Sequence, residues 1–405
     1  MRYNFPQIRR IEDVLPAIEG ESAFIVAQRD YGTIINYRQM GNDVFPPVET
    51  HGGSARMRAE ATRNKVLRRE CRGLIFDLNG DLISRPYHKF FNAGERTETL
   101  LENIPFDQPH NILEKLDGSM IRPLRMSDGS LRMGTKMGLT GVSAQVDPWV
   151  AAHMNYVTFM DHCLREQCTP IFEWCSRQQQ IVIDHPVDRL VLTAVRDNPT
   201  GGYLTYTQLQ ELAGEYGLDL VRQFEGSVES MQSLMDHTRD LQNAEGYVVR
   251  WLDGHMVKIK GEQYCQIHRA KEGILRENAV IEMILDEKLD DVKAFLLLDD
   301  RAALEQYESR FWQGVHVTAA EWQRVYTQVR ARYGNDRKGF ALAAGGMDGH
   351  VRSAVFKCWD QAHVDWCEMV TDTVRRNLST SIKTDAARGL WGNAVWDGSR
   401  MHGED

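Results

Sequence analysis

The chain has 405 residues, 42% of them hydrophobic and 26% charged, and a net charge of -9 at pH 7. This is ordinary globular composition, and the absence of any run of about 18 apolar residues argues against a membrane-spanning helix. The first residues lack the apolar core of a signal peptide, and the length allows two or three domains. Seven cysteines are scattered without a C-x-x-C pair, so we expect reduced, mostly buried thiols rather than structural zinc.

Up to about residue 272 the pattern predicts mostly short strands. Residues 23–27 and 74–78 are apolar runs bounded by turn residues, and Asn79-Gly80 predicts a hairpin after the second run. Asp253-Gly254 predicts another hairpin, between 248–251 and 256–260. Alternation in its second strand places Lys258 and Lys260 on one face, which suits a polyphosphate, although taken alone it fits a solvated strand face better.

After residue 272 the apolar spacing becomes helical. It predicts a helix over 280–296, one opened by a capping box at 318–321, and one over 353–378. The polar, glycine-rich stretch 379–405 surrounds Trp391 and Trp396, which either dock on the core or lie in a partly disordered tail. We therefore predict two domains, residues 1–272 and 273–405.

The string 115–120 carries a lysine just before an Asp-Gly turn. Asp117 and Gly118 suit a tight turn between two strands, from which the Lys115 amine would project. A lysine with the ordinary pKa of about 10.4 is a poor nucleophile, and burial beside other cations would lower that pKa. Taken alone, the string fits a solvated surface turn better than a nucleophile.

Further short strings surround Lys115 in a fixed order. They occupy residues 36–38, 70–76, 84–92, 135–138, 172–174, 245–250 and 257–260. This order resembles the covalent nucleotidyltransferase superfamily of ATP-dependent ligases and mRNA capping enzymes, and most closely the bacteriophage-type RNA ligase 1 family. Ser119 after the Asp-Gly favours RNA ligase, since DNA ligases usually have an apolar residue and then Arg there. The resemblance covers roughly the first two thirds of the chain, and the joint order is far more specific than any single string.

The resemblance implies an α+β fold: a nucleotidyltransferase domain of antiparallel sheets with flanking helices, followed by an all-α C-terminal domain. The helical period after residue 272 independently argues against an OB-fold, which would show about five short strands. The implied activity joins 5′-phosphate and 3′-hydroxyl ends of single-stranded RNA at the expense of ATP. Lys115 would take AMP from ATP, the AMP would pass to the RNA 5′-phosphate, and the 3′-hydroxyl would displace it.

The resemblance also assigns roles around the nucleotide. Lys258 and Lys260 match the terminal lysine pair, which would contact the α-phosphate and lower the Lys115 pKa. Glu173 would lie near the ribose, and Phe91 would stack on adenine. The other positions matched to the pocket are the cations Arg72, Lys89 and Lys136, then Tyr37, Asp117, and the glycines Gly118 and Gly246, which would let backbone approach the nucleotide.

Negative charge builds on the transferring oxygens, so a hard cation is expected, Mg2+ or Mn2+. Glu245 matches the family acid that helps position this cation. Asp290 falls where the family supplies a carboxylate after the lysine pair, although Asp290-Asp291 also fits the solvated acidic face of a helix.

An acidic chain can bind RNA only where positive charge is concentrated locally. Residues 63–72 and 324–338 are two such clusters, and each also fits a solvated helix face. The family's helical domain implies a bias towards broken tRNA anticodon loops. We further expect a monomer without a membrane partner, located in the cytoplasm, of the host cell if the chain is a phage protein.

Two other functions remain open from the sequence. A DNA ligase or capping-type transferase would share the first step, and joining assays on RNA and DNA strands would separate it from an RNA ligase. A non-catalytic RNA-binding protein on a degenerate scaffold is of a different class. The presence of Lys115, Glu245, Lys258 and Lys260 argues against it, because a binding module need not keep a nucleophile and its charged partners.

Overall fold

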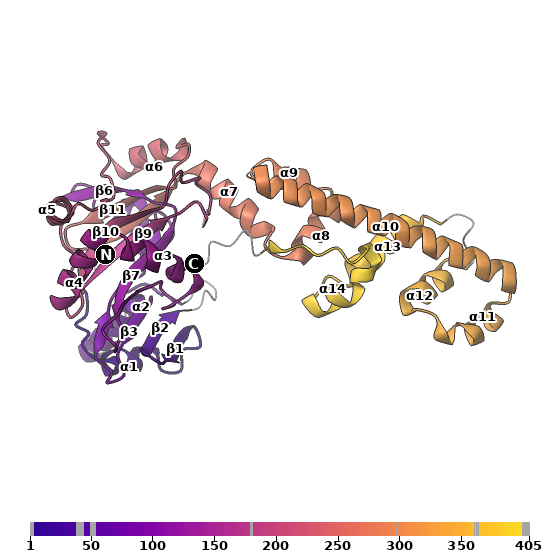
Figure 1. Ribbon diagram of the computed structural model, residues 1–405, viewed down its shortest axis with the longest axis horizontal. Helices are drawn as coiled ribbons and strands as arrows, with labels where there is room; N and C mark the ends of the chain where they lie inside the picture. Colours follow the sequence, from indigo (N-terminus) through magenta and orange to yellow (C-terminus); the bar gives the residue numbers. More distant parts are fainter. Residues whose placement is uncertain are drawn as a thin grey trace. The chain divides into compact units, whose positions relative to one another are not determined.

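The computed structural model describes residues 4–37, 44–48, 54–178, 181–296, 298–359, 361 and 364–398. The chain divides into two compact units, one ending at Cys265 and the other beginning at Gln266. In Figure 1 the first unit holds all labelled strands, and the second, in orange and yellow, is drawn as helices. The predicted α+β architecture with a helical C-terminal part is confirmed.

The described residues of the first unit form three four-stranded sheets. The first sheet has the order β1 (Phe24–Arg29), β2 (Gly32–Tyr37), β3 (Leu74–Phe76), β4 (Leu82–Ser84). The second has the order β10 (Arg189–Asp197), β9 (Cys168–Cys175), β7 (Ser119–Arg125), β8 (Leu131–Gly134). The third has the order β5 (Phe91–Asn92), β12 (Met256–Lys260), β11 (Gly246–Trp251), β6 (His110–Lys115). All pairings are antiparallel except that of β12 with β5.

Each sheet buries one face against helices, because its inward side chains are apolar. The helices of the first unit are α1 (Leu15–Ile18), α2 (Ala55–Glu70), α3 (Gly141–Ala151), α4 (Met154–Arg165), α5 (Tyr206–Tyr216) and α6 (Met231–Arg239). Helices α1 and α2 cover the first sheet, α3, α4 and α5 the second, and α6 the third. The hairpins predicted at Asn79-Gly80 and Asp253-Gly254 are confirmed, since these pairs lie between β3 and β4 and between β11 and β12.

Helix α7 (Glu262–Gly273) carries the chain past Cys265. The second unit continues with α8 (Glu277–Leu285), α9 (Leu289–Lys293), α10 (Leu298–Tyr333), α11 (Arg337–Ala343), α12 (Gly349–Lys357), α13 (Trp366–Arg376) and α14 (Ser381–Ala387). No helix among the described residues combines the length and apolarity that a bilayer crossing requires.

Three helix boundaries predicted for this unit were wrong. The capping box at 318–321 opens no helix, because α10 runs through it on an unbroken buried stripe that includes Phe311, Val315 and Trp322. The predicted helix 280–296 is divided into α8 and α9, and 353–378 into α12 and α13. Apolar periodicity continues across such breaks because both flanking helices pack on the same core.

The two tail tryptophans dock on this core. Trp391 is 0% and Trp396 8% exposed, and Trp396 Nε1 donates to the Ile274 carbonyl at 2.5 Å. The Trp391 backbone lies so close to Gly314 in mid-α10 that a Cβ there would stand 2.1 Å from the Trp391 carbonyl carbon. Of the two alternatives left open by the sequence, the structure therefore selects docking.

Candidate active site

The strand register of the third sheet brings the distant lysine motifs together. Lys115, the last residue of β6, lies opposite Gly246 of β11, and Gly246 lies opposite Lys260 of β12. Two residues back along β12, Lys258 lies opposite Val248. The turn predicted after Lys115 joins β6 to β7, and β6 is an edge strand of the third sheet.

Glu245 bridges two of these lysines. Its Oε2 lies 2.7 Å from Lys115 Nζ and its Oε1 lies 3.0 Å from Lys260 Nζ. The Glu245 side chain is 3% exposed, whereas those of Lys115 and Lys260 are 21% and 28% exposed. One buried carboxylate therefore holds two ammonium groups that remain open to solvent and to a ligand.

The lysine with the lowered pKa is not the one predicted. Burial acts to lower the Lys115 pKa, but Glu245, then Glu173 and Asp117, leave it raised above its ordinary value. Lys258 carries the large downward shift: burial, followed by the charges of Lys89 and Lys115, lowers its pKa to about 7. The expectation of a lowered Lys115 pKa was wrong for the nucleotide-free protein, because the carboxylates closest to the amine outweigh the effect of burial.

Three predicted phosphate cations gather around Tyr37. Burial acts to raise the Tyr37 pKa, yet the charges of Arg72, Lys89 and Lys136 leave it lowered. Lys89 Nζ donates to the Tyr37 hydroxyl at 3.3 Å. These residues come from β2, the turn after α2, the segment before β5 and the turn after β8. The fold therefore brings four separate motifs together. The third residue of the 36–38 string lies outside the described residues.

Asp117 contacts protein groups. Its Oδ2 accepts from the backbone N–H groups of Val182 and Ile183 at 2.8 and 2.6 Å, and its Oδ1 accepts from the Tyr264 hydroxyl at 2.7 Å. The Asp117 side chain is buried, and the Tyr264 ring lies beneath Lys260 Nζ at 5.1 Å. This carboxylate links the turn after Lys115 to α7 and to the loop after β9, and the predicted contact with the nucleotide stays a prediction.

Three other predicted nucleotide contacts also face protein. A Cβ on Gly118 would stand 2.3 Å from the Trp174 carbonyl oxygen, and one on Gly246, whose φ is +146°, would stand 2.0 Å from that of Ile259. Both glycines are therefore required by neighbouring strands. Phe91 is 2% exposed, with the guanidinium groups of Arg69 and Arg96 each 5.1 Å from its ring. The structure presents no open face of Phe91 for a base, because the ring is already covered.

The predicted acids differ in surroundings. Glu173 of β9 lies opposite Met120 of β7 and is close enough to raise the Lys115 pKa. Asp290 belongs to the second unit, where its side chain is 90% exposed and pairs with Lys293 at 3.0 Å. This geometry supports the solvated-face alternative for Asp290. The described residues contain no group of three or more acids, histidines or cysteines that could hold a metal ion.

Glu245 and Glu173 nevertheless suit a divalent cation of one kind. Mg2+ is commonly held by one or two carboxylates together with substrate phosphates and water, and does not need an all-protein cage. Both carboxylates act on the same amine, so both lie near Lys115 Nζ. The donor set therefore fits a metal that arrives with a nucleotide.

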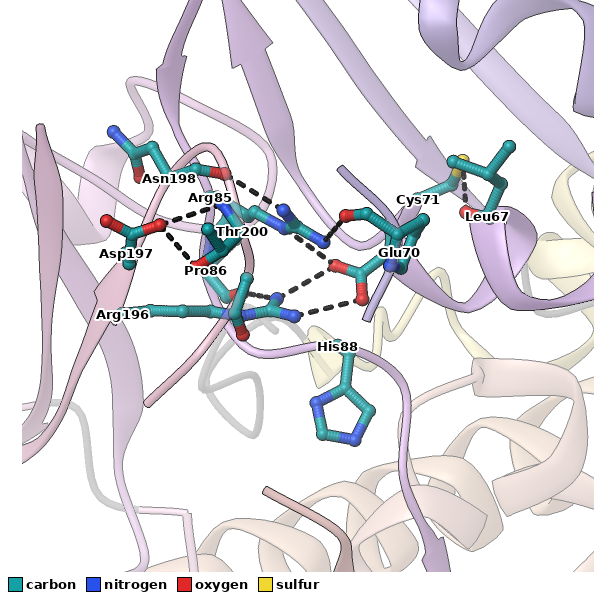
Figure 2. Close-up of polar contacts among 12 residues, drawn as sticks. Leu67, Glu70, Cys71, Arg85, Pro86, His88, Arg196, Asp197, Asn198 and Thr200 are labelled. Carbon is teal, nitrogen blue, oxygen red and sulfur yellow. Dashed lines mark hydrogen bonds and ion pairs between the residues drawn. The ribbon is translucent and has the colours of Figure 1, made fainter. Parts of the chain in front are cut away.

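No role was predicted from the sequence for a buried ionic cluster beside the site. Glu70, at the end of α2, lies 3.0 Å from Arg85 Nε and 2.9 Å from Arg196 Nη1. All three side chains are 0% exposed, and Figure 2 shows both guanidinium groups directed at the one carboxylate. His88 lies nearby, and burial followed by Arg196 holds its pKa well below the ordinary value. Glu70 and Arg85 belong to the 70–76 and 84–92 strings, and this membership was the sign in the sequence that they have a role.

An antiparallel sheet edge with a lysine nucleophile candidate and converging cations is typical of nucleotidyltransferases, and comparisons with known proteins give the family. A family model described as RNA ligase matches residues 70–264. A Thermovibrio ammonificans protein named "Putative RNA ligase" is 32% identical over 293 residues, 70% of this chain and 71% of its own length. The chain belongs to the RNA ligase family, and the resemblance deduced from the motif order is confirmed.

Two further likenesses are more distant. RNA ligase 1 of bacteriophage TS2126 is 25% identical over 244 residues, 55% of this chain and 57% of its own length. An archaeal ATP-dependent RNA ligase structure has a TM-score of 0.43 and 13% identity, covering 76% of this chain and 79% of its own. The family assignment rests on the sequence relatives.

Proposed function

We propose that the protein is an ATP-dependent RNA ligase that joins 5′-phosphate and 3′-hydroxyl ends of single-stranded RNA, with Lys115 as the nucleophile. The main observation in its favour is that the Glu245 carboxylate oxygens lie 2.7 Å from Lys115 Nζ and 3.0 Å from Lys260 Nζ. All three residues are inside the region that matches the family. A binding scaffold has no need for this arrangement, since its two lysines would serve equally well without a shared buried acid.

In the first step, a bond forms between Lys115 Nζ and the α-phosphorus of ATP, and the bond from that phosphorus to pyrophosphate breaks. The amine must first lose its proton, and the Glu245 oxygen at 2.7 Å is the acceptor in contact with it. Arg72, Lys89 and Lys136, whose charges all act on Tyr37, would hold the phosphates while negative charge moves to the leaving group. Lys258, with a pKa of about 7, would be more fully protonated beside bound phosphates and so add positive charge to the site.

The cofactors of this proposal are ATP and Mg2+ or Mn2+. Glu245 and Glu173 are the residues that would hold the metal, which would stabilise charge on the phosphate oxygens. In the later steps, AMP passes from Lys115 to the RNA 5′-phosphate, and the 3′-hydroxyl attacks that phosphate and releases AMP.

We also propose that the two parts of the chain, divided near residue 272, have different tasks, with the helical part selecting the RNA. Residues 324–338 carry five cations, Arg324, Arg330, Arg332, Arg337 and Lys338, and one acid, Asp336. The Arg330 guanidinium lies 5.1 Å from the Trp359 ring and that of Arg337 5.8 Å from Phe356. Such cations suit RNA phosphates. The bias towards broken tRNA anticodon loops, the monomeric state and the cytoplasmic location stay predictions.

The test is strand joining. The protein is incubated with ATP, Mg2+ and a 5′-phosphorylated RNA strand, with a DNA strand of the same sequence and the Lys115→Ala variant alongside. We expect joined RNA, much less joined DNA, and no product from the variant. Equal joining of DNA would support the DNA ligase alternative, and RNA binding without any product would support the non-catalytic scaffold.

A further inference from the structure

Arg122 is a buried cation in the middle of a core strand. It lies in β7, where it pairs with Gly134 of β8, and its side chain is 0% exposed. Neighbours Ile121 and Leu124 of the same strand are part of the apolar core. A guanidinium at such a position is costly, because burial removes its hydration.

The guanidinium is held by three acceptors from three separate segments. Nη2 donates to the carbonyl oxygens of Gly73, at 2.6 Å, and Thr135, at 3.2 Å. Nη1 donates to the Ser84 hydroxyl. One planar group therefore ties together the start of β3, the end of β4 and the turn after β8.

Each of these segments carries one of the proposed phosphate cations. Gly73 directly follows Arg72, Thr135 directly precedes Lys136, and Ser84 opens the segment that contains Lys89. The first two segments also touch each other, since a Cβ on Gly73, whose φ is +90°, would stand 2.6 Å from the Lys136 carbonyl oxygen. Arg122 thus contacts the backbone directly next to two of these cations, Arg72 and Lys136.

The charge of Arg122 is not neutralised by a neighbouring acid. No carboxylate forms an ion pair with it in the described part of the chain, and its Nε is buried without a hydrogen-bond partner. Burial, offset in part by Tyr31 and reinforced by Arg72, lowers its pKa to about 9, so the group is still protonated at neutral pH. Two other buried arginines of this unit differ, since Arg85 and Arg196 share the carboxylate of Glu70.

We propose that Arg122 is a positioning residue for ATP binding, which holds the backbones next to Arg72 and Lys136 at the separation that the polyphosphate requires. The inference rests on the proposed function, because it assumes that these cations contact ATP. Only an arginine provides a rigid fork that reaches all three acceptors, and a lysine would keep the charge but reach fewer of them. The competing interpretation is that Arg122 only satisfies buried carbonyl groups and stabilises the core.

The experiment compares Arg122→Lys with Leu124→Ala, which removes core volume from the same strand without touching the three acceptors. Transfer of labelled AMP to the protein is followed at several ATP concentrations, with the melting temperature of each preparation measured in parallel. We expect Arg122→Lys to raise the half-saturating ATP concentration about tenfold or more, since small displacements of positioning groups have large effects. Leu124→Ala, at a similar loss of melting temperature, should keep the wild-type value.

Equal half-saturating concentrations in the two variants would overturn the positioning role. If Arg122→Lys does not fold, Ser84→Ala decides, because it removes one acceptor and leaves the guanidinium in place; a raised half-saturating concentration supports the role, and an unchanged one refutes it. Wild-type protein that takes no label would refute the proposed function instead. The two failures are therefore distinguishable.

Discussion

Two carboxylates in the first unit each lie between two cations, and they are built differently. Glu70 pairs with Arg85 and Arg196, and all three side chains are 0% exposed. Glu245 is 3% exposed, but its partners Lys115 and Lys260 are 21% and 28% exposed. The Glu70 cluster is therefore fully buried, whereas the lysines that pair with Glu245 are partly exposed to solvent.

The choice of cation explains the difference. Arg85 and Arg196 spread their donors over further backbone carbonyls, including those of Pro6, Asn198, Gly201 and Pro86. Such forks fix several segments at once, whereas a lysine is a point charge on a flexible stem that can change partners. We therefore expect Glu70, between its two arginines, to stabilise the fold. Glu245, between two partly exposed lysines, can release these lysines to a ligand.

The largest effect is expected for Glu70→Gln. The substitution leaves two buried guanidinium groups without a counter-charge, so we expect a loss of about 3–5 kcal/mol in the free energy of unfolding. Urea unfolding would measure it, with exposed Glu12→Gln as the matched control that changes little. If the free energy of unfolding changed as little in Glu70→Gln as in the control, the cluster would not stabilise the fold.

The same cluster predicts acid sensitivity. Despite burial, which acts to raise it, the Glu70 pKa is lowered from 4.5 to about 2 by Arg196 and Arg85. A carboxyl with a lowered folded-state pKa stabilises the protein above its unfolded pKa and loses that contribution as pH falls towards the folded pKa. The wild type should therefore lose stability between pH 4.5 and about 2 by more than Glu70→Gln does.

The next largest effect is expected for Glu245→Gln, and it should appear in catalysis. We expect a loss of about 10²-fold or more in the rate of AMP transfer to the protein, with little change in melting temperature. Because Glu245 raises the Lys115 pKa, the midpoint of the rate against pH should also move to lower pH. A loss of stability in Glu245→Gln as large as that in Glu70→Gln would contradict the proposed difference between the two carboxylates.

Asp117→Asn should have a smaller effect, which appears both in stability and in catalysis. The carboxylate accepts from three protein donors, so weakening these bonds should cost about 1–3 kcal/mol and misplace the turn after Lys115. Urea unfolding and single-turnover AMP transfer should both respond, and Tyr264→Phe, which removes one donor, should give a smaller change of the same sign. Full activity in Asp117→Asn would refute its positioning role.

The smallest effect is a proton taken up when ATP binds. Lys258 has a pKa of about 7, so it is largely neutral at about pH 8.5, and a bound polyphosphate would favour its charged form. Calorimetry in buffers of different protonation enthalpy should detect uptake of up to about one proton per ATP. Lys258→Met should abolish the uptake, whereas exposed Lys288→Met should not.

The sequence predicted the elements whose signals are local. Hairpin turns at Asn79-Gly80 and Asp253-Gly254 and the strand alternation of Lys258 and Lys260 needed no knowledge of packing. The capping box at 318–321 failed because burial of the α10 stripe outweighs a local cap. Motif order also identified Lys115 and Glu245 as residues of one site, which the register of β6, β11 and β12 brings together.

The electrostatics could not be predicted in the same way. Whether a lysine pKa rises or falls depends on which charge is nearest, and Lys115 and Lys258 differ in this respect although both belong to the same site. Arg122 was not predicted because its partners are backbone carbonyls, which leave no trace in a sequence. Glu70 stood within a recognised string, but only its burial between two arginines gives it a role.

The most direct test of the account is to find where AMP becomes attached. The protein is incubated with ATP and Mg2+, digested, and its peptides are analysed by mass spectrometry for one added adenylyl group. We predict that this group is on Lys115 alone and that pyrophosphate, added afterwards, removes it. An adenylyl group on Lys258 or Lys260, or none on protein that is folded and free of AMP beforehand, would contradict it.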